Sequence, residues 1–252
     1  MKYIIYSHSD YEDIATIQSD KISHLSDTFL VTNKLNPTSV IFNNFKNYKT
    51  YNDLLQYPGR LFDGISSLSD KYVLFMHDMD ILLHADEEYL EDLVSLMDKK
   101  NIDRIDLKHN SEIHPANSNH YQITENTYAC KTTLFTPYVY NVNPALWKLS
   151  VLKDVMNVFR NENYRSIEHS NIQSYCSEKF RFYKMFTTDI VKAGYYSCIP
   201  NFQFLHLSHH GGLLPLQDNE EHLDDNIRKN YLNMVETYNL RQNSRPFRSQ
   251  MW

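Results

Sequence analysis

Hydrophobic and polar positions at the start of the chain alternate in blocks of secondary-structure length. Residues 2–6 and 28–32 are apolar, β-rich runs that predict two strands, and residues 12–25 between them predict a helix. A strand, a helix and a second strand within about thirty residues are typical of a parallel α/β unit. Ligands of such a sheet bind at the carboxyl ends of its strands.

Later blocks continue this alternation. The continuous apolar run at residues 71–76 predicts a buried central strand, and residues 87–100, with Leu90, Leu93 and Met97 at helical spacing, predict an amphipathic helix. We expect the other segments as follows: residues 51–69 a helix and a turn, 110–137 a polar loop or lid, 144–159 and 170–184 helices, 195–206 strand and turn, and 220–240 a surface helix before a tail.

The composition restricts the classes of protein that fit. The 252 residues, of which 42% are hydrophobic and 22% charged, suit one α/β domain with a full core. The net charge of −6 offers no basic surface for nucleic acid. The sequence contains no apolar run long enough to span a bilayer, it opens on a strand rather than a cleavable leader, and its three cysteines are widely spaced. We therefore expect a cytoplasmic protein without a disulfide framework.

Glycine is scarce, with five residues in the whole sequence. None of them belongs to a GxGxxG or GxxxxGK pattern, which cradles phosphates in dinucleotide-binding and P-loop proteins. A nucleotide would therefore have to be held by a different device.

Residues 77–80, with the sequence His-Asp-Met-Asp, directly follow the predicted buried strand. In an extended chain alternate residues share a face, so we expect Asp78 and Asp80 to project together and Met79 to point into the core. Two adjacent carboxylates repel each other unless a cation lies between them, and hard oxygen ligands suit Mg²⁺ or Mn²⁺. The pair predicts a metal site that binds a diphosphate.

With this motif after an apolar strand, the chain resembles the GT-A class of nucleotide-sugar glycosyltransferases. The resemblance implies one Rossmann-like α/β domain with a mostly parallel central sheet flanked by helices. It divides the chain into a donor-binding half at about residues 1–100, an acceptor half at about 101–215, and a C-terminal helix and tail at 216–252. The order of elements supports it over most of the chain, at residues 3–6, 60, 72–80, 143–147, 193–195 and 200–206.

The resemblance also implies an activity, the metal-dependent and inverting transfer of a sugar from a nucleotide-diphosphate sugar to a hydroxyl acceptor such as a carbohydrate. The metal would be Mn²⁺ or Mg²⁺, held by Asp78, Asp80 and a late histidine, for which His206 fits best and His209 is next. The resemblance and the strand ends together predict the donor-binding residues Ser7, His8, Asp10, Asn33, Arg60 and Asp78.

Inversion requires a general base for the acceptor hydroxyl. The resemblance places a carboxylate between the acceptor strand and the late histidine, where Glu168 and Glu178 are the two candidates. The Glu-Asp pair of the family is missing at both positions, and we favour Glu168 because it lies just before a predicted helix. The aromatic and histidine-rich residues 110–140 form either an acceptor surface or a satellite core.

Two other classes of function fit the same residues. A metal-dependent phosphoester hydrolase or nucleotidyltransferase would use Asp78, Asp80 and the late histidines, although a second metal requires further carboxylates near the motif. A non-catalytic protein that binds sugars or nucleotides would keep the fold without turnover. Hydrolysis of a nucleotide sugar with Mn²⁺ and no acceptor distinguishes these classes, because it requires a working donor site.

Overall fold

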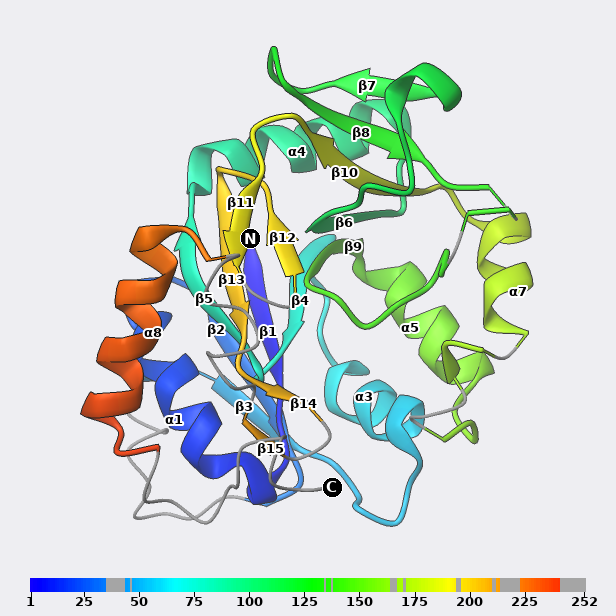
Figure 1. Ribbon diagram of the computed structural model, residues 1–252. Coiled ribbons are helices and arrows are strands. Elements are labelled where there is room, and N and C mark those ends of the chain that lie inside the picture. Colours follow the sequence, from blue (N-terminus) through cyan, green and yellow to red (C-terminus); the bar gives the residue numbers. More distant parts are fainter. Residues whose placement is uncertain are drawn as a thin grey trace.

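Strands and helices alternate along the chain (Figure 1). The computed structural model describes residues 1–34, 44–45, 47–133, 135–136, 138–163, 167–169, 171–193, 196–209, 212–213 and 223–240, and for residues 208, 209, 212 and 213 it describes the backbone alone. The strands are β1 (Lys2–Tyr6), β2 (Thr28–Thr32), β3 (Asn47–Thr50), β4 (Tyr72–His77), β5 (Asp80–Ala85), β6 (Arg104–His109), β7 (His120–Gln122), β8 (Thr127–Lys131), β9 (Ala145–Lys148), β10 (Phe182–Thr187), β11 (Val191–Ala193), β12 (Tyr196–Cys198), β13 (Phe202–His206), β14 (Ser208–His209) and β15 (Gly212–Leu213). The helices are α1 (Glu12–Lys21), α3 (Tyr57–Ile65), α4 (Glu87–Lys100), α5 (Leu149–Val158), α7 (Ile172–Lys179) and α8 (Asp225–Thr237), with short 3₁₀ turns at Ser9–Tyr11 and Pro115–Asn117.

The main sheet has the strand order β3-β2-β1-β4-β9-β6-β10-β8-β7. β3, β2, β1 and β4 pair in parallel, and β6 pairs in parallel with β10. β9 lies between β4 and β6 and is antiparallel to both, so β4 and β6 run in the same direction. The predicted α/β fold with a mostly parallel sheet is confirmed, and the carboxyl ends of β1, β2, β4, β6 and β10 lie at one edge of the sheet.

Helices cover both faces of this sheet (Figure 1). α1, α4 and α8 pack on one face, where Ile14, Leu90 and Met234 belong to the apolar core. α3, α5 and α7 pack on the other face, where Leu61 and Leu152 belong to a second core. Within the described ranges, no helix has the length and apolar character needed to cross a membrane.

The predicted helix over residues 87–100 is confirmed as α4. Asp86 caps its N-terminus, because the Asp86 Oδ1 accepts a hydrogen bond from the amide of Tyr89 (3.1 Å). The helix ends at Asn101, which has the left-handed conformation (φ 50°) that often terminates helices. The first two predicted strands are confirmed as β1 and β2, whereas α1 and α8 are shorter than predicted. The predicted tail at residues 241–252 lies outside the described residues.

The prediction of one helix over residues 144–159 is wrong. Ala145–Lys148 is strand β9, and helix α5 starts at Leu149. Leu146 and Trp147 are buried, and β9 forms ladders with β4 and β6. A strand of four residues is too short to show a clear period of two, and pairing with two neighbours outweighs its local preference.

Two further segments differ from the prediction. In residues 170–184 the helix α7 ends at Lys179, and the aromatic run that follows enters the sheet as β10. Residues 110–137 contain β7 and β8 rather than a continuous loop, and β8 pairs with β10. Helix α3 begins at Tyr57, later than predicted, with Pro58 in its first turn. The sequence predicts a helix where β10 lies, so the pairing of β8 with β10 does not follow from local patterns.

Candidate functional site

The Asp-Met-Asp motif forms a tight turn rather than the expected extended chain. β4 ends at His77, Asp78 and Met79 form the turn, and β5 begins at Asp80. The two aspartates are buried, with 2% and 3% of their surface exposed. Met79 is half-buried and lines a cavity, so the expectation that it points into the core is wrong. Because the chain turns here, the two carboxylates meet different partners.

Gln18 of α1 fixes this turn from the core. Its Nε2 donates to the carbonyl of Asp80 (3.2 Å), and its Oε1 accepts from the amide of Leu82 (2.9 Å). The amide of Leu207 donates to the carbonyl of Met79 (2.8 Å) and ties the turn to the end of β13. Gln18 was not predicted from the sequence, although a glutamine on the buried face of a helix is a recognisable signal for a polar contact.

Ser7 joins the motif to the end of β1. Its hydroxyl donates a 2.5 Å hydrogen bond to Asp78 Oδ2, and the Asp78 amide donates to the carbonyl of Tyr6 (2.9 Å). These residues line a cavity of about 270 Å³, here called the first cavity. All the predicted donor-binding residues line it except Asn33. The complete lining is Tyr6, Ser7, His8, Asp10, Tyr11, Tyr57, Arg60, His77, Asp78 and Met79.

Aromatic side chains form much of the wall of the first cavity. The ring of Tyr6 stacks on that of Tyr51, which does not itself line the cavity, with centroids 5.4 Å apart, and the Tyr57 hydroxyl lies 3.0 Å from Nε2 of His77. Burial lowers the pKa of His77 to about 4 against the opposing charge of Asp80, so this imidazole is neutral at neutral pH. Neither the wall tyrosines nor His77 were predicted as site residues, although Tyr6 ends a predicted strand and His77 directly follows another.

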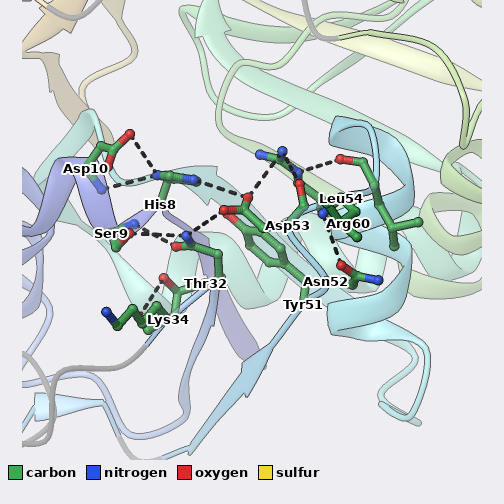
Figure 2. A network of polar contacts seen from close by, with 12 residues as sticks. His8, Ser9, Asp10, Thr32, Lys34, Tyr51, Asn52, Asp53, Leu54 and Arg60 are labelled. Atoms are coloured by element: carbon green, nitrogen blue, oxygen red, sulfur yellow. Dashed lines mark hydrogen bonds and ion pairs between the residues drawn. The ribbon is translucent and has the colours of Figure 1, made fainter.

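A polar network borders the first cavity (Figure 2). Asp53 lies at its centre, with its Oδ1 3.3 Å from Nε2 of His8 and 3.2 Å from the Arg60 guanidinium, while its Oδ2 accepts from Asn33 (3.1 Å). Partial burial opposes ionisation of Asp53, but the Asn33 hydrogen bond and the charges of Arg60 and His8 hold its pKa below the usual value. Asn33 and Asp53 thus join the loops after β1, β2 and β3, and Arg60 of α3 is attached to this network through Asp53. The contact of Asn33 and Arg60 with a donor stays a prediction.

His206 contacts Asp80. Its Nδ1 lies 2.6 Å from Asp80 Oδ1, and the two buried residues are in register between β13 and β5. Asp78 lines the first cavity, whereas Asp80 and His206 do not. The side chain of His209 lies outside what the structure describes, and among the described residues no group of three or more His, Cys, Asp or Glu side chains could hold a metal ion. The described residues therefore fit Mn²⁺ or Mg²⁺ in part. Asp78 and Asp80 both offer suitable carboxylate oxygens, and of the two Asp78 lines the first cavity.

A second and larger cavity, of about 470 Å³, lies at the carboxyl end of β6 and beside Lys184 in the middle of β10. It is called the second cavity below. Of residues 110–140, a short polar turn and one tyrosine line it, so most of the aromatic segment predicted as a possible acceptor surface does not. The complete lining is Lys108, His109, Asn110, Ser111, Glu112, Tyr138, Asn141, Asn143, Glu168, His169, Lys184 and Tyr196.

Of the two predicted bases, Glu168 lines the second cavity and Glu178 does not. Oε1 of Glu168 accepts a hydrogen bond from the amide of Val142 (2.9 Å). Burial raises the pKa of Glu168, against the lowering effects of this hydrogen bond and of the nearby His169 and Arg104. Glu178 is exposed in the last turn of α7. The geometry therefore favours Glu168 as the group that can act on a ligand.

Buried charged side chains lie beneath the second cavity. Arg104 and Asp106 of β6 and Lys184 of β10 are at most 1% exposed. Asn141 links the first two, since its Oδ1 accepts from Arg104 and its Nδ2 donates to Asp106, each at 2.6 Å. Burial lowers the pKa of Lys184 to about 8 against the opposing charge of Asp106. These residues were not predicted, although β6 alternates charged and apolar residues and so places its charges on one face of the sheet.

The two cavities lie at the same edge of the sheet, on either side of β9. Phe75 of β4 and Asp106 of β6 both pair with Ala145 of β9. His77 and Lys108, two residues further along β4 and β6, line the first and the second cavity respectively. Ligands in the two cavities would therefore be neighbours.

No protein-family model and no curated protein matches the sequence. Solved structures do share the fold. Residues 1–349 of S. aureus TarS, crystallised with UDP-GlcNAc, match with 16% identity over 78% of this chain and a TM-score of 0.50; the match covers 58% of that chain.

Two further structures match with lower TM-scores. A UDP-glucose pyrophosphorylase complexed with UDP-glucose matches with 10% identity over 75% of this chain and 92% of that chain, at a TM-score of 0.44. A 4-diphosphocytidyl-2C-methyl-D-erythritolsynthase from Anaerococcus prevotii matches with 12% identity over 75% and 89%, at a TM-score of 0.47. At these identities the likeness to TarS shows the fold alone, and the chain has a GT-A-like fold.

Proposed function

We propose that this chain is a metal-dependent glycosyltransferase that moves a sugar, with inversion, from a nucleotide-diphosphate sugar to a hydroxyl acceptor. The observation that carries the proposal is the pair of neighbouring cavities, with the carboxyl group of Asp78 in the first and that of Glu168 in the second. Transfer requires donor and acceptor to be held side by side. The complex of TarS with UDP-GlcNAc supports the choice of donor, because that protein has a similar fold.

In this proposal the first cavity binds the nucleotide. Its tyrosine rings offer apolar faces to a base, and the Ser7 hydroxyl orients the carboxylate of Asp78 by a hydrogen bond. Mn²⁺ or Mg²⁺ held by Asp78 and Asp80 would neutralise the charge that develops on the leaving diphosphate. His206 positions Asp80 from the opposite strand.

The second cavity would hold the acceptor hydroxyl, with Glu168 as the general base. The Val142 amide orients its carboxylate. Because burial raises the pKa of Glu168, it is a stronger base than an exposed glutamate. It takes the hydroxyl proton as the acceptor oxygen bonds to the anomeric carbon, and the diphosphate leaves with the electron pair of the broken carbon–oxygen bond.

Product analysis tests this proposal. The protein is incubated with Mn²⁺ and either UDP-GlcNAc or another nucleotide sugar, with and without a panel of carbohydrate acceptors. We expect release of the nucleoside diphosphate, faster with an acceptor and abolished by EDTA. Pyrophosphate formation from a nucleoside triphosphate and a sugar phosphate would instead indicate a nucleotidyltransferase. Nucleotide-sugar binding without turnover would indicate a non-catalytic protein.

A further inference from the structure

The buried cluster beneath the second cavity contains more positive than negative charge. Arg104 and Lys184 contribute two cations and Asp106 one carboxylate, and all three are at most 1% exposed. Burial of a net charge is unfavourable unless a counter-charge lies close by. Lys184 lines the cavity, so an anionic ligand bound there would add negative charge beside this cluster.

Asp106 and Arg104 are held by partners inside the protein. Oδ2 of Asp106 accepts hydrogen bonds from the side-chain amides of Asn141 (2.6 Å) and Asn143 (3.3 Å). The guanidinium carbon of Arg104 lies 5.0 Å from the ring centroid of Trp147, and the Arg104 side chain donates to Asn141. These contacts fix both charges in place. Lys184, the third member of the cluster, lines the cavity.

The wall around Lys184 offers a second cation and several hydrogen-bond donors. Nζ of Lys108 lies 4.2 Å from the ring centroid of Tyr196, and three asparagine side chains also line the cavity. The carboxyl groups of the wall are Glu112, which is exposed, and Glu168, whose pKa is raised by burial. Lys108 and Lys184 are the side chains of this wall that carry an ammonium group with which an anion can pair.

We propose that the second cavity recognises an anionic group of the acceptor, a phosphate or a carboxylate, through Lys184 and Lys108. The inference rests on the proposed function, because it takes this cavity as the acceptor site. Recognition of an anion does not require turnover, however, and is measurable by binding alone. Charge-assisted hydrogen bonds from two ammonium groups suit either anion, and the side-chain amide nitrogen of Asn110 can donate to a hydroxyl group beside it.

Matched pairs of small molecules test the inference. Glycerol 3-phosphate is compared with glycerol, and glucuronate with glucose, in NMR titrations of the full chain with UDP and Mn²⁺ present to occupy the first cavity. We expect at least one anion to bind about tenfold or more tightly than its neutral counterpart, and the pair that responds identifies phosphate or carboxylate. Lys184→Met should weaken that binding by about tenfold or more. Lys99→Met, on the exposed side of α4, should leave it unchanged.

The pH dependence provides a readout that needs no variant. Burial lowers the pKa of Lys184 to about 8, with Arg104 and Lys108 acting in the same direction and Asp106 and Glu112 against it. The ammonium form dominates below that pH, so anion affinity should fall as the pH rises through about 8. His109, His169 and Glu168 also line the cavity; burial and the charge of Lys108 lower the pKa of His109, and burial raises the pKa of Glu168.

Equal affinity for the charged and neutral members of both pairs would overturn the inference, as would anion binding that Lys184→Met leaves intact. Should Lys184→Met fail to fold, Lys108→Met and the pH profile of the unaltered protein provide the same decision. UDP affinity is measured in the same samples. If UDP does not bind while the anion binds through Lys184, the proposed donor is wrong and the anion site stands. If the protein transfers a sugar to a neutral acceptor and shows no preference for the anion, the proposed function stands and the anion site is wrong.

Discussion

The two cavities lie at one edge of the same sheet but are built in different ways. Most of the first cavity comes from residues that directly follow β1 and β4 or open α3. The second cavity combines strand residues of β6, β10 and β12 with residues 138–143 and 167–169, which are distant in the sequence. A site at the ends of parallel strands can be inferred from short motifs, whereas a site assembled from distant segments depends on the topology.

The charges of the two cavities also differ in their exposure to water. Asp53 and Arg60, which border the first cavity, have 49% and 26% of their side chains exposed. Arg104 and Asp106, beneath the second cavity, have 0% and 1% exposed. Water and salt screen the first pair strongly and the second weakly. We therefore expect substitutions beneath the second cavity to affect stability, and substitutions around the first cavity to affect mainly binding.

The largest effect on stability is expected for Asp106→Asn. Without this carboxylate, Arg104 and Lys184 lose their buried counter-charge, and we expect the free energy of unfolding to fall by about 3–5 kcal/mol. Asp154→Asn is the control. Asp154 pairs with Lys179 (2.7 Å) near the surface, so this substitution should lower the free energy of unfolding by less than about 1 kcal/mol. Denaturant unfolding measures both. Similar losses for the two variants would contradict the contrast between buried and screened charges.

The largest effect on binding is expected for Asp78→Asn. This substitution removes the carboxylate that reaches the first cavity, so nucleoside diphosphate affinity in Mn²⁺ should fall by about 100-fold, and the remaining affinity should no longer depend on the metal. Calorimetry with and without EDTA measures this. Asp92→Asn, on the exposed side of α4, is the matched control and should behave as the unaltered chain. Metal-dependent affinity that survives Asp78→Asn would show that the nucleotide binds elsewhere.

A kinetic effect separates the second cavity from the first. Glu168→Gln should lower transfer by about 10²-fold while UDP affinity is unchanged, because the general base acts on the acceptor. The base works deprotonated, and burial raises its pKa. As the pH is lowered, the unaltered enzyme should therefore begin to lose activity at a higher pH than an enzyme whose base is an exposed glutamate. The pH–rate profile of the variant should lack this acidic decline. Glu178→Gln, exposed on α7, should keep full turnover. The opposite result would move the base to Glu178.

Sequence patterns predicted the elements whose hydrophobic pattern repeats over several turns and the strands that are buried along their whole length. α4 could be inferred because its apolar positions repeat over three turns and acidic and basic residues occupy its two ends. β9 could not, because four residues followed directly by a helix resemble the start of that helix. β10 shares this difficulty: its place in the sheet comes from pairing with β6 and β8, which are remote in the sequence.

The same reasoning explains which site residues could be inferred. Ser7, His8 and Asp78 follow predicted strands, and the topology of a parallel sheet brings such residues together. The floor of the second cavity could not be inferred, because Asp106 and Lys184 come from strands whose adjacency the sequence does not reveal. The alternating charges of β6 resemble a solvent-facing strand until the fold buries them.

The smallest effect is expected for Asp53→Asn. The folded-state pKa of Asp53 is lower than that of an unfolded aspartate, so its ionised form stabilises the fold above about pH 4, and this contribution is lost as the pH falls through the folded-state pKa. Because the side chain is half exposed, screening keeps the contribution below about 1 kcal/mol, which corresponds to less than about 2–4 °C in Tm for a chain of this size. The Tm difference from the unaltered protein should be present at pH 7, decline below pH 4, and shrink in 1 M NaCl. The loss of stability caused by Asp106→Asn should persist in 1 M NaCl. If salt reduced the loss equally for both variants, the two charge networks would be equally screened by solvent, which would contradict the comparison.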